Sequence, residues 1–220
     1  MSDAHLADWR ARILRNQHQW RSCFDRDFWT YGGAWYVDIE EGAPARYHAE
    51  AMEWNRRLRQ FPGLRQSVKR IAALLPRRVP AVPRRAILGP YWTDYGFAVY
   101  DRDGRSGVAH TDVEGLIPYP ASMFDQNTEA YSATISIDCP AAGGGLWIHA
   151  RRHIGHYHGA TSRKGWTLHG YQPGTLTVFD SFLPHSIERF ALSNACPRRM
   201  VLVVHFLYRK KPYPHYQYWV

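Results

Sequence analysis

The sequence predicts a mainly β protein with a helical N-terminal region. In residues 86–220, short runs of β-branched and aromatic residues are separated by Gly, Pro and Asp, as in strands joined by turns. In residues 1–85, apolar residues recur at roughly helical spacing. Because the strands do not alternate with helical segments, we expect a sandwich or barrel rather than βαβ units. A double-stranded β-helix (jelly roll, cupin-like) flanked by helices fits this pattern best.

Three helices are expected in the N-terminal region. Residues 4–24 carry apolar residues among polar ones near helical spacing, which favours an amphipathic helix. Residues 44–61 and 63–75 show the same pattern, and Pro62 separates them. Pro44 suits a first helical position, where its missing N–H costs nothing.

Two segments depart from the helical pattern. Residues 28–37 are aromatic and contain a Gly pair, which favours a short strand, a turn and another strand. Residues 76–85 mix proline with arginine, so we expect a connector, with a polyproline docking segment or a basic nucleic-acid strip as alternatives. The strands expected after it are Tyr91–Trp92, Gly96–Tyr100, Ser132–Ile137, Leu146–Ile148, Thr175–Phe179 and Met200–Val204.

Length and composition suit one domain spanning residues 1–220. A hydrophobic content of 45% excludes a disordered chain, and no run of about 18 apolar residues offers a membrane span. The N-terminus shows no secretory signal, and the widely spaced Cys23, Cys139 and Cys196 favour free thiols, so we expect a cytoplasmic protein. The formal charge of +9 favours anionic partners and leaves nucleic acid, an acidic protein and a carboxylated small molecule open.

The first motif that carries chemistry is His110-Thr111-Asp112. In an extended segment, side chains alternate faces, so His110 and Asp112 would point the same way. Together with the distant His185 they offer two nitrogen ligands and one oxygen ligand, the set that binds mononuclear non-haem Fe(II) and leaves positions open. A surface pair is the alternative for the motif alone.

Four segments in this order make the β region resemble the Fe(II)/2-oxoglutarate-dependent dioxygenases, and among them the prolyl-hydroxylase-like branch. The resemblance covers about residues 90 to 208. Its segments are Tyr100 to Gly104 leading to His110-Thr111-Asp112, Ile135 to Asp138 followed by Gly143 to Leu146, Pro173 to Phe179 leading to His185, and Arg199 to Leu202.

The resemblance implies a site and its cofactors. His110, Asp112 and His185 would bind Fe(II) and form the catalytic centre, with 2-oxoglutarate as cosubstrate, O2 as oxidant and ascorbate as a candidate reductant. Arg199 is the expected partner of the far carboxylate of 2-oxoglutarate, because a guanidinium binds a carboxylate bidentately. Tyr100 and Ser136 occupy positions where the family often places hydroxyl groups that bond the cosubstrate.

The expected reaction is hydroxylation of an unactivated C–H bond, with release of succinate and CO2. Related halogenases carry a small residue at the position of Asp112, and the carboxylate here argues against halogen transfer. A chain without a recruitment domain suits a small molecule, either an amino acid or a natural-product intermediate, and an anionic substrate stays open. A peptidyl or protein hydroxylase and a non-catalytic jelly-roll binding module are the alternatives, and the oligomeric state is not determined.

Other clusters have weaker interpretations. Alkylated nucleic-acid demethylases of the same superfamily show a second arginine six residues after the first. Here that position is His205, so nucleic acid is not the expected partner, and His205 itself is expected to be a core histidine. Asp180, Ser181 and His185 lack the glycine context of a hydrolase nucleophile. His153 with His156 or His158 could bind zinc in principle. A basic loop is the preferred interpretation of this stretch, which also contains His149, Arg151 and Arg152.

Overall fold

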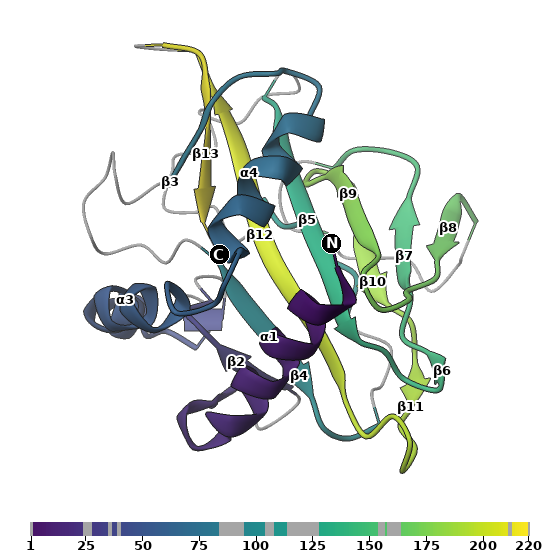
Figure 1. Cartoon of the computed structure of the whole chain (residues 1–220). Helices are drawn as coiled ribbons and strands as arrows, with labels where there is room; N and C mark the ends of the chain where they lie inside the picture. The colour runs from purple at the N-terminus through teal and green to yellow at the C-terminus, as the bar shows by residue number, and fades with distance from the viewer. Residues whose placement is uncertain are drawn as a thin grey trace.

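A computed structural model shows two facing groups of β-strands with helices packed on the outer side of the larger one (Figure 1). The structure describes residues 2–23, 28–34, 37–38, 41–83, 95–103, 108–113, 128–153, 157, 164–210 and 213–219. The expected mainly β fold with a helical N-terminal region is confirmed.

The expected helices are present, but the first is shorter than its apolar pattern suggested. The helices are α1 (Asp3–Arg15), the short 3-10 helix η1 (Gln17–Gln19), α3 (Pro44–Leu58) and α4 (Leu64–Leu74). Asn16 ends α1, where its side-chain amide donates to the carbonyl of Arg12 at 2.8 Å. Trp20 lies beyond the helix, and its indole N–H donates to the carbonyl of Ile13 at 3.0 Å. The apolar residues after Arg15 therefore fold back onto α1 instead of extending it.

In the segment expected as strand, turn and strand, the described residues contain the first strand and no second one. Strand β2 (Phe28–Tyr31) ends at Gly32, whose φ of +117° and close approach to Gly96 suit a residue without a side chain. Val37 and Asp38 are helical, in a turn where the N–H of Val37 donates to the carbonyl of Ala34 at 3.1 Å. The prediction of a second strand reaching Val37 is wrong, because the backbone N–H groups of Val37 and Asp38 both donate to the carbonyl of Ala34 in a helical turn. The Asp38 carboxylate pairs with Arg21 and Arg46.

The larger sheet has eight strands and is centred on β12. One edge of β12 pairs with β4 and then with β13, and its other edge pairs with β5. Beyond these neighbours, β2 and β1 follow β4, β3 follows β13, and β9 follows β5. The remaining strand bounds are β1 (Arg21–Cys23), β3 (Ala81–Pro83), β4 (Gly96–Tyr100), β5 (Ala130–Asp138), β9 (Leu176–Asp180), β12 (Arg199–Arg209) and β13 (His215–Trp219).

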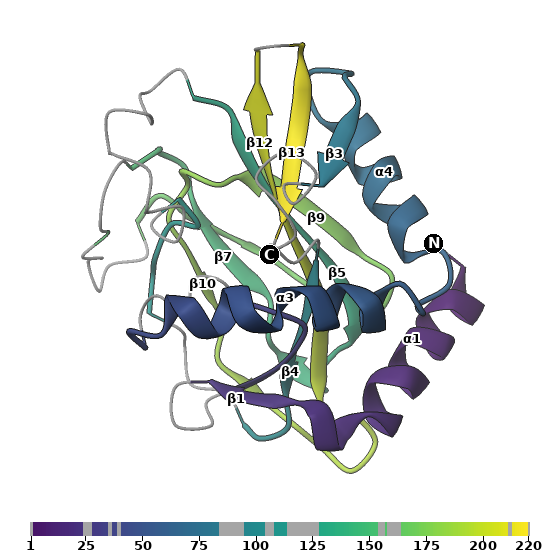
Figure 2. The same ribbon diagram turned by 90° about the vertical axis from the view of Figure 1, so that its left-hand side faces the viewer.

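The smaller layer lies on the side of the large sheet opposite α1 and α4 (Figures 1 and 2). It consists of a three-stranded sheet and a two-stranded sheet. The first contains β10 (His185–Ile187), β7 (Leu146–His149) and β8 (Trp166–His169), and the second contains β11 (Phe190–Ala191) and β6 (Ala142–Gly143). The space between the two layers is where the chemistry-bearing side chains meet.

The main hydrophobic core lies between the large sheet and the helices. Alternate residues of β5 and β12 point to opposite faces, and the outward ones pack with the apolar faces of α1 and α4. These outward residues are Ala133, Ile135 and Ile137 on β5 and Met200, Leu202, Val204 and Phe206 on β12. The inward residues include Ser132, Thr134 and Ser136 on β5 and Arg199, Val201, Val203 and His205 on β12.

The proline-rich segment expected as a connector contributes a strand. Residues 81–83 form β3, which runs parallel to β13, with Pro83 beside Tyr218. Proline is tolerated there because β3 lies at the edge of the sheet and its missing N–H interrupts no further pairing. The expected strand Tyr91–Trp92 lies outside the described residues, and no helix among those described is long and apolar enough to cross a membrane.

Two substitutions in α4 test the assignment of its buried face. Ile71 is 2% exposed and Leu74 is 70% exposed on the same helix. We expect Ile71→Ala to lower the free energy of unfolding by about 2–5 kcal/mol, because it leaves a cavity under the helix. Leu74→Ala should change it by no more than about 0.5 kcal/mol. Urea denaturation followed by tryptophan fluorescence measures both, and equal losses would contradict the packing of α4.

Candidate metal centre

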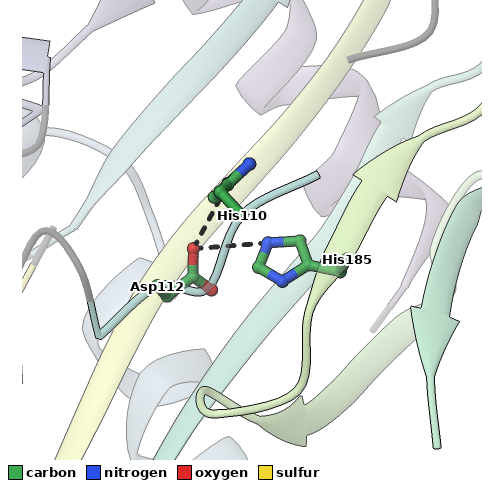
Figure 3. A group of neighbouring side chains, drawn as sticks. All are labelled: His110, Asp112 and His185. Atoms are coloured by element: carbon green, nitrogen blue, oxygen red, sulfur yellow. Dashed lines mark ion pairs between the residues drawn. The ribbon is translucent and has the colours of Figure 1, made fainter. Parts of the chain in front are cut away.

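The three expected metal ligands converge because the backbones of two distant segments pair. His110 forms an isolated antiparallel bridge with His185, in which each backbone N–H donates to the carbonyl of the other residue, at 3.0 and 2.8 Å. Asp112 lies in the turn that follows. His185 opens strand β10, so one ligand belongs to the smaller layer and two come from the segment that runs beside it (Figure 3).

The ligand atoms form a cluster of a size that suits one metal ion. Oδ1 of Asp112 lies 3.3 Å from Nε2 of His185 and 3.8 Å from Nε2 of His110. All three ligand atoms lie within 4.8 Å of one another. Two imidazoles and one carboxylate are the facial set of mononuclear non-haem Fe(II) sites, which leaves further coordination positions open.

Each metal-ligand imidazole is oriented by the backbone carbonyl of the residue two positions before it. Nδ1 of His110 lies 2.9 Å from the carbonyl of Val108, and Nδ1 of His185 lies 3.1 Å from the carbonyl of Leu183. A carbonyl only accepts, so each Nδ1 carries the proton and donates it. The lone pair of each ring is then on Nε2, which faces Asp112, and this is the tautomer that a metal ligand requires.

Burial makes the cluster asymmetric. The His110 side chain is 45% exposed, whereas that of His185 is 7% exposed and that of Asp112 is 15% exposed. Burial alone would raise the pKa of Asp112, but the positive charge that His185, His205 and His110 carry when protonated outweighs it and lowers that pKa below its usual range. Asp112 is therefore ionised, as a metal ligand must be, and the site is open on the side of His110.

The alternative zinc site falls partly outside the described residues. Within the ranges that the structure describes, His110, Asp112 and His185 are the only group of three His, Cys, Asp or Glu residues that could bind a metal ion. His149 packs on Trp166 and His153 packs edge-on against Tyr157, with ring centroids 5.3 and 5.2 Å apart. His156 and His158 lie outside the described residues.

Arg199, the first residue of β12, lies buried on the inner face of that strand. It is 2% exposed and its Nε donates to the carbonyl of Gly144 at 3.1 Å. The guanidinium carbon lies 5.0 Å from the ring centre of Tyr100 and 5.2 Å from that of Tyr171. Among the described residues no carboxylate pairs with it, and its buried Nη1 has no hydrogen-bond partner. A buried guanidinium in this state favours an anionic ligand, because an uncompensated buried charge is costly.

The Gly-Gly turn that precedes β7 contains the carbonyl of Gly144, which accepts the hydrogen bond from Arg199. Gly143 has a φ of +73°, and a Cβ there would lie 2.1 Å from the carbonyl oxygen of Arg189. Only glycine fits this close approach. The turn noticed in the sequence therefore orients the guanidinium.

Tyr100 and Ser136 both lie near Arg199. Tyr100 is directly opposite it in the pairing of β4 with β12, and burial raises the pKa of the Tyr100 phenol while Arg199 opposes the rise. Ser136 is 1% exposed on the inner face of β5 beside Val201. Their predicted contact with a cosubstrate stays a prediction.

Sequence reasoning missed Tyr171, which contacts Arg199, and Thr134, which contacts Tyr171. The Tyr171 and Thr134 hydroxyl oxygens lie 3.0 Å apart, and burial raises the pKa of the Tyr171 phenol. Thr134 alternates with Ser136 along β5, so the periodicity of the strand could have identified it. Tyr171 follows β8, a strand that the sequence did not predict, and nothing local connected it with Arg199.

Comparison with solved structures identifies the fold. An N-substituted L-amino acid dioxygenase from Burkholderia ambifaria AMMD superposes with a TM-score of 0.58 at 14% identity, covering 100% of this chain and 84% of that protein. Its complex with alpha-KG gives the same TM-score at 12% identity, covering 100% and 83%. The non-heme alpha ketoglutarate dependent epimerase SnoN from nogalamycin biosynthesis gives 0.53 at 14% identity, covering 94% and 77%. No protein-family model and no curated protein sequence matches the chain.

The chain has the jelly-roll fold of the Fe(II)/2-oxoglutarate oxygenases. The expected jelly-roll fold is confirmed, and the His110 bridge adds the segment of His110 to β10 of its smaller layer.

Loss of one imidazole should remove metal binding. We expect His185→Ala to lower the affinity for Co(II), used as an oxygen-stable probe, by more than the roughly 10–100-fold that loss of an outer partner of a ligand costs. His169→Ala, an exposed histidine on β8 of the same layer, is the control and should bind Co(II) as the unmodified protein does. Calorimetric titration measures both, and unchanged affinity in His185→Ala would refute the assignment.

Proposed function

We propose that this protein is an Fe(II)- and 2-oxoglutarate-dependent oxygenase that hydroxylates an unactivated C–H bond of a small molecule. The observation that carries the proposal is the presence of two groups that face the interior between the two layers. One is an open set of two imidazoles and one carboxylate, hydrogen-bonded to Ser132 of β5. The other is the buried guanidinium of Arg199 on β12, which has no carboxylate partner among the described residues. A dicarboxylate with a metal-binding 2-oxo acid at one end satisfies both.

The residues present suit both groups. His110, Asp112 and His185 would bind Fe(II), and Arg199 would bind the far carboxylate of 2-oxoglutarate through the guanidinium nitrogen that has no protein partner among the described residues. When bound, iron and 2-oxoglutarate supply the oxidising power for cleavage of the C–H bond, with release of succinate and CO2. In this proposal the chain itself binds and orients the cosubstrate, and Tyr171, which contacts Arg199, packs against the apolar cluster of Leu146, Ile148 and Phe179.

The carboxylate of Asp112 supports hydroxylation over halogen transfer. It is ionised, and its Oδ1 is directed toward both imidazoles. It therefore occupies the place at which a smaller residue would leave room for a halide. The proposal assigns the open positions to the cosubstrate and oxygen.

The substrate is proposed to be an amino acid or a natural-product intermediate. The structurally similar proteins include a dioxygenase described as acting on N-substituted L-amino acids and an epimerase from nogalamycin biosynthesis, which supports a small molecule. The net charge of +9 favours an anionic one. A peptidyl substrate is the second candidate, and the screen below distinguishes the two.

Turnover of 2-oxoglutarate tests the proposed activity. With Fe(II), ascorbate and a panel of amino acids, peptides and carrier-bound intermediates, we expect succinate release and a product 16 Da heavier than its substrate, as one oxygen insertion requires. Asp112→Ala should abolish succinate release, because it removes the only carboxylate of the metal set. Asp8→Ala, on α1, is the matched control and should retain it. Succinate release that persists in Asp112→Ala would refute the site.

Binding of 2-oxoglutarate by Arg199 is tested by removing its charge. We expect Arg199→Gln to raise the KM for 2-oxoglutarate about 100-fold, the scale expected when a charge-assisted bidentate pair worth roughly 3 kcal/mol is lost. Arg198→Gln removes the same charge from the neighbouring, less buried residue and should leave the KM within about threefold. An equal effect of the two substitutions would show that general charge, rather than the buried guanidinium, attracts the cosubstrate.

A further inference from the structure

We propose that Ser132, Ser181 and His205 act together as positioning residues that orient Asp112, so that only its Oδ1 faces the metal. The inference rests on the proposed function and adds three residues to the site. None of the three belongs to the expected metal or cosubstrate ligands, and His205 was expected only to fill the core.

The network contacts the carboxylate oxygen that points away from the imidazoles. The hydroxyl of Ser132 donates to Oδ2 of Asp112. Ser132 Oγ in turn lies 2.8 Å from Oγ of Ser181 and 3.2 Å from Nδ1 of His205. His205 Nδ1 is 3.8 Å from the same Oδ2. Oδ1 is left to face His185 and His110, at 3.3 and 3.8 Å.

The number of protons fixes the direction of each hydrogen bond. An ionised carboxylate only accepts, and the Ser132 hydroxyl has one proton, which it donates to Asp112. Ser132 must therefore accept from Ser181 and from His205. His205 consequently carries its proton on Nδ1, and two donors converge on the hydroxyl that bonds the metal ligand.

Strand register places the three groups where they meet. Ser132 is directly opposite His205 in the pairing of β5 with β12, and both side chains lie on the inner face. Ser181 follows β9, whose last residue, Asp180, is opposite Tyr131 on β5. Ser132, Ser181 and His205 are 1%, 2% and 9% exposed, so bulk water does not readily replace the donors. Loss of one donor leaves a buried polar group without its hydrogen bond.

Fixing Oδ2 controls how many metal positions the carboxylate occupies. A carboxylate with two equivalent oxygens can bind a metal through one or both. A second bond from Asp112 would take a position that the cosubstrate or oxygen requires in the proposed reaction. By engaging Oδ2, the network favours binding through one oxygen, so its loss should alter the metal and cosubstrate sites without removing any ligand.

The experiment compares Ser132→Ala and His205→Leu with two matched variants, all loaded with Co(II). His205→Asn keeps an N–H donor close to the position of Nδ1, so it should restore much of what His205→Leu loses. Ser186→Ala removes a serine that is 1% exposed and adjacent to the ligand His185 but outside the network. The readouts are Co(II) affinity, the visible d–d spectrum, and the affinity of the Co(II) form for 2-oxoglutarate. Near-ultraviolet circular dichroism confirms that each variant is folded.

We expect Ser132→Ala and His205→Leu to lower Co(II) affinity roughly 10–100-fold, the range found for outer partners of metal ligands. Their d–d bands should change and their 2-oxoglutarate affinity should fall, while Ser186→Ala and His205→Asn stay close to the unmodified protein. If Ser132→Ala does not fold, the comparison of His205→Leu with His205→Asn decides.

The two proposals fail in different ways. If the unmodified Co(II) protein does not bind 2-oxoglutarate, the proposed function is wrong. If it binds 2-oxoglutarate but the spectrum and affinities of Ser132→Ala and His205→Leu match those of Ser186→Ala, the positioning network is wrong while the proposed function stands. Equal losses in His205→Asn and His205→Leu would also overturn the network, because the donor would then not matter.

Discussion

The antiparallel pairing of β5 with β12 is the constraint on which the core and the site both depend. Its register sends apolar side chains such as Ile135 and Leu202 to the helices and sends Ser132, Arg199 and His205 to the interior between the layers. A shift by one residue would exchange the two faces, exposing the core residues to the site and burying the arginine under α1 and α4. Hydrophobic packing against the helices therefore also fixes which polar groups line the site. The fold and the site are specified by the same alternation.

The polar interior carries a free-energy cost that the chain only partly compensates. Arg199 has the carbonyl of Gly144 and two aromatic rings, Tyr100 and Tyr171, which attract a cation weakly. A well-packed apolar side chain in place of Arg199 would destabilise the folded state less than the buried guanidinium does. In the proposed function, the far carboxylate of the cosubstrate offsets this charge. Binding of an anion to Arg199 would stabilise the folded state by mass action, which would couple anion binding to stability.

The sequence allowed prediction of features that depend on local spacing, and it missed those that depend on tertiary contacts. The bounds of α4 follow from its apolar periodicity, and His110 and Asp112 form a short motif that is readable without a structure. Tyr171 could not be found in this way, because it follows β8 of the smaller layer and contacts Arg199 of β12 only in the folded protein. Apolar periodicity also gave a wrong end for α1. Trp20 has the spacing expected if the helix continued, but it lies beyond α1 and its indole N–H donates to the carbonyl of Ile13. Apolar periodicity shows which residues are buried. It does not show whether a buried residue such as Trp20 continues the helix or folds back against it after a turn.

The metal set joins layers that otherwise meet mainly through side chains. His185 belongs to the smaller layer, whereas Asp112 is tied by Ser132 to the large sheet. A cation bound between them would therefore connect the two layers across the interior, and the His110 bridge pairs the segment that carries Asp112 with the smaller layer. The spacing between the layers is set independently by the apolar contacts of Leu146, Ile148 and Phe179. Because packing determines that spacing before any ion arrives, the ligand atoms are already close together and little reorganisation is required on binding.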